Sequence, residues 1–249
     1  MIYLIFIFGL IIGSFLNVVI YRYNTGRGIG GRSGCFSCGK TLAWYELFPV
    51  LSFLLQKGRC TKCYTKLSWQ YPLVELITGL MFALIYSMFG FTLAGLIYLL
   101  IGIYSIMISV YDIRHTIIPD SWVYTLSVFG IILNYQNIVN VLIAGLIIFS
   151  FFALLWLMGR GNWMGFGDAK LGLAMGLVLG ISKGVTAVMV GFWLGAIVGI
   201  LLMILTKIFS KFNYHLKSEI PFGPFLILGM WLSIVFNLDL VWMAGLFAF

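Results

Sequence analysis

The chain has 249 residues, of which 62% are hydrophobic and only 9% are charged, and its mean hydropathy is +1.10. This composition leaves too little polar surface to cover a water-soluble globule, so it excludes a soluble enzyme and indicates an integral membrane protein. The formal net charge of +8 requires no nucleic acid as a partner, because basic loops that face an anionic lipid surface account for it.

Apolar runs long enough to cross a bilayer recur along the chain. About 20 helical residues span a hydrocarbon core roughly 30 Å thick. The runs predict an all-α polytopic membrane protein with about eight transmembrane helices, of which the fourth and the sixth are short. They lie near residues 2–20, 73–89, 93–111, 121–134, 138–158, 168–182, 184–206 and 224–247.

Basic residues predict the orientation of these helices. No basic region precedes the first run, whereas Arg22 and Arg27 follow it, which indicates a retained helix with its N-terminus outside and not a cleaved signal peptide. With eight spans, fourteen of the fifteen Lys and Arg residues fall on one side of the membrane, and only Lys183 falls opposite. The positive-inside rule makes the basic side cytoplasmic.

A polar segment at residues 21–71 follows the first helix. We expect it to form a small cytoplasmic loop domain between a first helix at 1–20 and a membrane domain at 72–249. It contains all four cysteines, in two Cys-x-x-Cys pairs: Cys35, Cys38, Cys60 and Cys63.

The spacing of the two pairs is typical of a tetrahedral zinc site, in which each pair presents two thiolates from a tight turn. A reducing cytoplasm also disfavours disulfides. Four thiolates leave no open position on the metal, so the expected Zn²⁺ is structural and stabilises a loop too small for a substantial core. A redox-active pair and plain buried thiols are the alternatives.

Acidic residues are scarce, which makes each of them informative. Two are expected to be solvated in cytoplasmic loops, Glu46 and Glu219, and a third, Asp239, to be interfacial or to bond a neighbouring helix. Asp112 ends the third run in "SVYDIRHTIIPD", and Asp168 begins the sixth in "GFGDAKL". Helix capping explains a carboxylate at a helix start, but negative charge at a helix end is unfavourable. An ionisable residue at membrane depth is therefore a candidate for function.

Two carboxylates brought within about 3 Å of one another share a proton. The ionised member can take a proton from water while the protonated member polarises a peptide carbonyl. The glycines at 165 and 167 (Gly165 and Gly167) would let a substrate backbone approach Asp168 closely. A polar transporter site and simple helix capping remain alternatives to such an aspartyl dyad.

Six segments together resemble the prepilin peptidases, also called type IV leader peptidases, a bacterial branch of the GxGD intramembrane aspartyl proteases. In family order they are "GSFLNVVIYR" at 13–22, the two cysteine pairs, "LSWQYPLVELITG" at 67–79, "DIRHTIIPD" at 112–120, "GFGDAKL" at 165–171 and "PFGPFLILG" at 221–229. The similarity covers nearly the whole chain.

The resemblance implies an endopeptidase of the bacterial cytoplasmic membrane that removes the basic leader of type IV prepilins or pseudopilins after Gly, at the cytoplasmic face. The family's catalytic aspartates carry over to Asp112 and Asp168. Asp120 is the rival for the first role, although capping after Pro119 suffices for it. Many members also N-methylate the new N-terminus with S-adenosylmethionine, and some lack the cysteines, which implies that zinc takes no part in cleavage.

Several polar residues are expected to support this site. Asn17, Arg22 and Glu75 lie at membrane depth, where they would pair with one another or with substrate; an Arg22–Glu75 ion pair is one hypothesis, and interfacial snorkelling of Arg22 is the other. Lys170 would add positive potential near the aspartates or serve as a cytoplasmic anchor. The "PFGP" break at 221–224 would shape a substrate groove.

Three other functions stay open on the residues. A signal-peptide-peptidase-like or presenilin-like protease shares "YD" at 111–112 and "GFGD". A transporter would use the same aspartates to bind protons or cations. A zinc-dependent interaction module would need the cysteines and not the aspartates.

Overall fold

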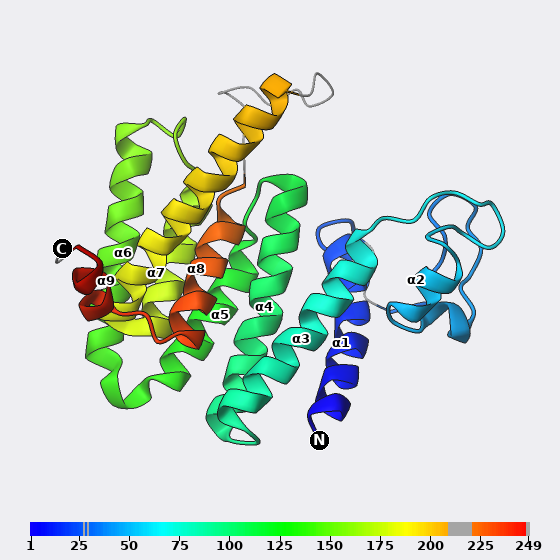
Figure 1. Ribbon diagram of the computed structural model, residues 1–249, viewed down its shortest axis with the longest axis horizontal. Coiled ribbons are helices and arrows are strands. Elements are labelled where there is room, and N and C mark those ends of the chain that lie inside the picture. The colour runs from blue at the N-terminus through cyan, green and yellow to red at the C-terminus, as the bar shows by residue number, and fades with distance from the viewer. Residues whose placement is uncertain (27, 29, 209–220, 248–249) are drawn as a thin grey trace. The chain divides into compact units, whose positions relative to one another are not determined.

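The computed structural model describes residues 1–26, 28, 30–208 and 221–247 (Figure 1). Arg27, Lys211, Lys217 and Glu219, which the sequence places on the cytoplasmic side, lie outside the described residues. The described residues form helices and turns with two isolated β-bridges and no strand. The prediction of an all-α protein is therefore confirmed.

Within the part of the chain that the structure describes, five helices are long and apolar enough to cross a membrane, which confirms a multi-pass membrane protein. They are α1 (Ile2–Arg22), α3 (Gln70–Phe89), α4 (Leu93–His115), α6 (Ile138–Met158) and α7 (Phe166–Ile208). The shorter helices are α2 (Leu51–Leu55), α5 (Asp120–Leu133), α8 (Gly223–Val235) and α9 (Leu240–Phe247), with 3-10 turns η1 (Trp44–Leu47) and η2 (Tyr135–Asn137). The expected count of eight spans is not confirmed.

The two runs predicted at 168–182 and 184–206 belong to the single stretch α7, which is interrupted at Gly180. Gly180 has φ 74° and ψ −174°, a conformation essentially confined to glycine. The Asn134 side-chain amide, after α5, donates to the carbonyls of Leu177 at 3.0 Å and Val178 at 2.9 Å. These are carbonyls whose helical partners would lie beyond Gly180, so Asn134 compensates for the interruption.

The last predicted span, 224–247, is wrong as a single helix, because it divides into α8 and α9. Asn237 adopts φ 53°, and the N–H of Leu238 donates to the Ser233 carbonyl at 3.1 Å, as in a helix C-terminal motif. Asp239 then accepts the N–H of Trp242 at 2.9 Å and caps α9. Asp239 thus bonds its own helix, and its place at the membrane interface stays a prediction.

The chain divides into two compact units, Met1–Met107 and Ile108–Phe249. In the first, α1 packs along α3 through glycines: a Cβ on Gly9 would lie 2.8 Å from Cα of Gly79. In the second, α7 packs against α5, α6 and α8. Small residues let membrane helices approach closely. The predicted boundaries at 20/21 and 71/72 stay a prediction.

Candidate functional site

Two buried carboxylates lie in the unit Ile108–Phe249. Asp112 is in the last turn of α4 and is 4% exposed, and Asp168 is in the first turn of α7 and is 7% exposed. The two carboxyl groups are close enough to interact electrostatically. Carboxylates are almost never buried to this degree without compensating partners, because desolvation is costly.

Asp112 is held by the start of α8. The N–H of Gly223 donates to Oδ2 of Asp112 at 3.0 Å, and an ideal Cβ on Gly223 would lie 2.7 Å from the same oxygen. The "PFGP" segment therefore supplies a backbone donor to Asp112. Sequence reasoning noted the helix break there but did not identify Gly223 as a contact of the aspartate.

Ile118, in the turn between α4 and α5, lies between the two glycine-containing segments. An ideal Cβ on Gly167 would be 3.0 Å from Cβ of Ile118, and one on Gly223 would be 3.3 Å from its Cδ1. The space beside Gly167 is thus filled by the protein's own side chain. An ideal Cβ on Gly165 would lie 3.7 Å from Oδ2 of Asp168, its nearest neighbour among the described residues. Gly165 therefore leaves more room for a ligand beside the carboxylate.

Asp120 and Lys170 form an ion pair in the same unit. The Lys170 ammonium lies 2.7 Å from Oδ1 and 2.6 Å from Oδ2 of Asp120, whose side chain is 51% exposed. Asp120 makes no side-chain cap at the start of α5, where Pro119 is the N-cap residue. The Asp120 carboxylate is bonded by Lys170, which also lies 5.4 Å from the Phe166 ring centroid. Asp120 lies in the first turn of α5, where its charge complements the helix dipole.

The other predicted polar residues lie in the unit Met1–Met107. Asn17 is 2% exposed and donates to the Tyr71 carbonyl at 3.2 Å. Glu75 is 7% exposed and accepts the N–H of Val50 at 2.7 Å. Arg22 donates to the carbonyls of Gly28 and Gly30. These contacts tie α1, α3 and the polar loop together, while the Arg22–Glu75 ion pair stays a prediction.

The four cysteines come together in two equivalent turns. In each turn the N–H of the first cysteine, Cys35 or Cys60, bonds a carbonyl five residues later, at 2.9 and 3.0 Å. The residue four positions after that cysteine, Gly39 or Tyr64, has positive φ and returns a bond to its carbonyl. The sequence motif thus folds as a repeated knuckle.

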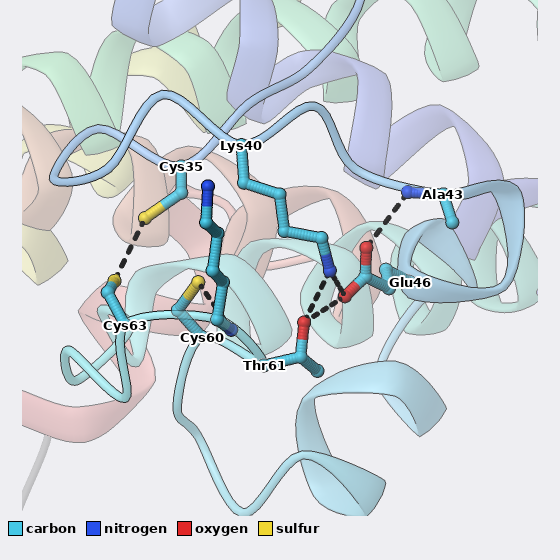
Figure 2. Close-up of polar contacts among 8 residues, drawn as sticks. Cys35, Lys40, Ala43, Glu46, Cys60, Thr61 and Cys63 are labelled. Carbon is cyan, nitrogen blue, oxygen red and sulfur yellow. Dashed lines mark hydrogen bonds and ion pairs between the residues drawn. The ribbon is translucent and has the colours of Figure 1, made fainter.

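The geometry of the cysteine cluster fits a metal. All four sulfur atoms lie within 4.8 Å of one another, and the Sγ atoms of Cys35 and Cys63 are 3.7 Å apart (Figure 2). In a tetrahedral zinc site with Zn–S bonds of about 2.3 Å, neighbouring sulfurs are about 3.8 Å apart. The four cysteines therefore form a metal-capable cluster.

Glu46 joins the two knuckles, as Figure 2 shows. Its carboxylate accepts bonds from Lys40 Nζ at 2.8 Å, Thr61 Oγ1 at 2.6 Å and the Ala43 N–H at 2.9 Å. Lys40 first, then Thr61 and Ala43, lower the pKa of Glu46 to about 2. Glu46 is 6% exposed, so the expectation that it is solvated is wrong.

A cavity of about 1050 Å³ lies in the same unit, where the polar loop meets the ends of α1 and α3. Its lining includes four aromatic rings, from Tyr21, Phe36, Phe53 and Tyr71. The Tyr21 ring stacks on Tyr71 with centroids 5.3 Å apart and lies 5.5 Å from Phe36. Arg22 and Glu75 add charged groups to the lining.

Comparison with known families finds two matching domains. Residues 7–89 match the bacterial peptidase A24 N-terminal domain, and residues 99–200 match the type IV leader peptidase family. No solved structure matches the chain.

Curated relatives carry consistent names. The type 4 prepilin-like proteins leader peptide-processing enzyme of Escherichia coli O78:H11 is 34% identical over 67% of this chain and 72% of that protein. The prepilin leader peptidase/N-methyltransferase of Pseudomonas aeruginosa is 28% identical over 92% of this chain and 88% of its own length. A protein of the same name from Myxococcus xanthus is 42% identical, over 47% of this chain and 35% of that protein.

Proposed function

Because the chain belongs to the type IV leader peptidase family, we propose that it is a membrane aspartyl endopeptidase that removes the basic leader of type IV prepilins or pseudopilins. The observation that carries the proposal is the burial of Asp112 and Asp168 within electrostatic reach of each other. A presenilin-like protease and a transporter are not favoured, since the family match also includes the cysteine-bearing segment at residues 7–89.

Asp112 and Asp168 form the catalytic pair in this proposal, and Asp120 does not. Asp112 accepts the N–H of Gly223 and Asp168 that of Gly165, and such a donor stabilises the ionised form of either carboxylate; the proposal takes Asp112 as the base. Asp112 removes a proton from water, whose oxygen bonds to the scissile carbonyl carbon, while protonated Asp168 polarises the carbonyl oxygen. The carbon–nitrogen bond then breaks and the leaving nitrogen takes up the proton.

The substrate is presented at the membrane surface. The proposal keeps the N-terminus of the enzyme outside and the aspartates at the cytoplasmic face of the bacterial cytoplasmic membrane, where water is available. The apolar segment of the prepilin would lie in the bilayer and its basic leader would stay in the cytoplasm. Gly165, beside Asp168, is the position at which a substrate backbone has room to approach.

Mass spectrometry of a purified prepilin incubated with the enzyme and S-adenosylmethionine tests the activity. We expect the wild type to release the leader, and Asp112→Asn to lose at least about a hundredfold of the cleavage rate. Asp239→Asn is the matched control, because asparagine caps a helix as well as aspartate does. Full cleavage by Asp112→Asn would exclude the dyad.

We also propose N-methylation of the new N-terminus, the second activity in the names of the relatives. The cavity of about 1050 Å³ is large enough for S-adenosylmethionine, and its rings at Tyr21 and Tyr71 suit an adenine base. When bound, this cofactor supplies an electrophilic methyl group. Calorimetric titration of the cofactor into wild type and Tyr71→Ala, with leader cleavage measured separately, tests the assignment.

The four cysteines would hold structural zinc, and Glu46 would brace the two knuckles around it. Metal analysis of the purified protein checks the first point: one zinc per chain is expected, and none in Cys60→Ser. A chelator should destabilise the loop and leave leader cleavage within a few-fold of its rate. A complete loss of cleavage on chelation would assign the metal a catalytic role.

A further inference from the structure

The segment Trp44–Leu55, which joins the two knuckles and contains η1 and α2, exposes many large apolar side chains. They are Trp44, Tyr45, Leu47, Phe48, Leu51, Leu54 and Leu55, with Leu55 83% and Trp44 74% exposed. Its one charged residue, Glu46, is turned inward to Lys40 and Thr61. A water-exposed loop domain rarely presents such a continuous apolar surface.

This segment lies beside the part of α1 that crosses the membrane. A small cavity of about 350 Å³ is lined by Ile11, Phe15 and Val18 of α1 together with Trp44 and Phe48 of the segment. Ile11 precedes the last residue of α1 by roughly 16 Å along the helix axis. The segment therefore lies alongside α1 itself and not only beyond the C-terminal end of that helix.

A partly buried hydrogen bond fixes the segment at this depth. The N–H of Val50 donates to the carboxylate of Glu75, which lies in the second turn of α3 and also bonds the Ser14 side chain. Val50 has φ 60°, a conformation that β-branched residues seldom adopt. Such strain persists only where the surroundings hold the backbone in place, and the bond to Glu75 does so here.

We propose that Trp44–Leu55 is an interfacial anchor whose exposed side chains are covered by bilayer lipid. Continuity argues for lipid as the occupant: Ile7, Ile11 and Phe15 expose an apolar face on α1, a candidate span, and the small cavity joins that face to the segment. Aromatic residues prefer the depth of the head groups. The basic residues that follow, Lys57 and Arg59, suit anionic lipid. The anchor does not depend on the proposed peptidase activity.

Spin-label accessibility in liposomes tests the anchor with the full chain. Tyr45, Leu55 or Tyr64 is replaced by p-acetylphenylalanine, to which a nitroxide is attached, so that the cysteines stay unmodified. Tyr45 and Leu55 test the segment, and Tyr64 is the control. Tyr64 is an exposed tyrosine of the second knuckle, at 70%. Labels at Tyr45 and Leu55 should collide severalfold more often with oxygen, which concentrates in lipid, than with a water-soluble nickel chelate; the Tyr64 label should show the reverse.

Two results would overturn the proposal. Equal nickel access at all three positions would place the segment in water, and protection from both reagents would mean that protein, either a second copy or a bound prepilin, covers it. A second measurement uses the native Trp44 side chain, whose fluorescence is the difference between the wild type and Trp44→Phe. Brominated lipids should quench this component. An unquenched Trp44 component would also contradict the anchor.

Discussion

Glu46 in the cysteine-bearing loop and Asp112 at the end of α4 are buried to almost the same degree, at 6% and 4% exposure. Their partners differ. Glu46 accepts bonds from an ammonium, a hydroxyl and a backbone N–H. Among the described residues, the Asp112 side chain accepts a hydrogen bond from the Gly223 N–H, and its charged neighbour is another acid, Asp168. Burial alone therefore does not distinguish a structural carboxylate from a functional one.

The difference in partners has an energetic meaning. A carboxylate taken out of water costs several kcal/mol unless opposite charge and donors compensate for the loss. Lys40 and Thr61 provide that compensation for Glu46. Near the aspartate pair, the ammonium of Lys170 is bound to Asp120. The unused acceptor capacity of Asp112 and Asp168 is what a water molecule and a peptide carbonyl would occupy in the proposed reaction.

Exchanging each acid for its amide should separate activity from stability. Asp168→Asn should lower the cleavage rate by at least about a hundredfold and leave the melting temperature unchanged or higher, because an uncompensated buried charge is removed. Glu46→Gln should lower the stability of the loop by roughly 2 kcal/mol, since it loses charge-assisted bonds, and keep cleavage within a few-fold. Cleavage kinetics and thermal unfolding in detergent measure the two effects.

The opposite pattern would break the comparison. If Glu46→Gln abolished cleavage at full stability, the loop carboxylate would belong to the active site. If Asp168→Asn unfolded the protein, its burial would be structural.

Gly223→Ala should disturb the aspartate pair while both aspartates are retained. Its added methyl group would meet Oδ2 of Asp112 at 2.7 Å, so the carboxylate must shift, and a displacement of this size should cost roughly tenfold in kcat. Gly245→Ala is the matched control, because no atom of the described residues lies within 4 Å of an ideal Cβ there. Equal kcat values for the two variants would show that Gly223 does not position Asp112.

Local patterns in the sequence were sufficient to predict part of the fold and part of the candidate site. The spacing of the cysteines predicts the cluster because each pair is closed by bonds within six residues of the chain. Asp112 stands out over Asp120 in the sequence because a negative charge at a helix end is unfavourable. The structure shows Asp120 exposed and paired with Lys170, and the choice of Asp112 as the catalytic residue stays a prediction. The long apolar runs predict α1, α3, α4 and α6, because a helix that crosses the hydrocarbon core needs about 20 consecutive apolar residues, and such runs are visible in the sequence.

Contacts between distant segments were not predictable in this way. Glu46 meets Thr61, fifteen residues later, only once both knuckles have formed, so by composition alone it reads as a solvated loop acid. Gly223 reaches Asp112 across 111 residues of sequence. The break between α8 and α9 has a local signal, Asn237 followed by Asp239, but it lies within a run whose hydropathy masks it.

The partners of Glu46 also predict an acid dependence of loop stability. Its pKa falls from an ordinary 4.5 to about 2 in the folded loop, so the folded state binds a proton less readily than the unfolded state. The stabilisation is complete above about pH 4.5 and is lost as the pH falls towards about 2. The difference in unfolding temperature between wild type and Glu46→Gln should therefore shrink across this window. A constant difference would mean that the charge of Glu46 contributes nothing.

Asp239 differs from both of these acids, because it is partly exposed and bonds its own helix. Its substitution is expected to have the smallest effect. Asp239→Ala should cost about 1 kcal/mol in the first turn of α9, because the Trp242 N–H loses its acceptor, whereas Asp239→Asn should cost almost nothing. Hydrogen exchange of the Trp242 amide should quicken about fivefold in the alanine variant only. Cleavage should be unchanged in both, because a cap satisfies one helix end and leaves the buried pair as it is. Slower cleavage in Asp239→Asn, with the cap intact, would show that the charge itself acts on the site.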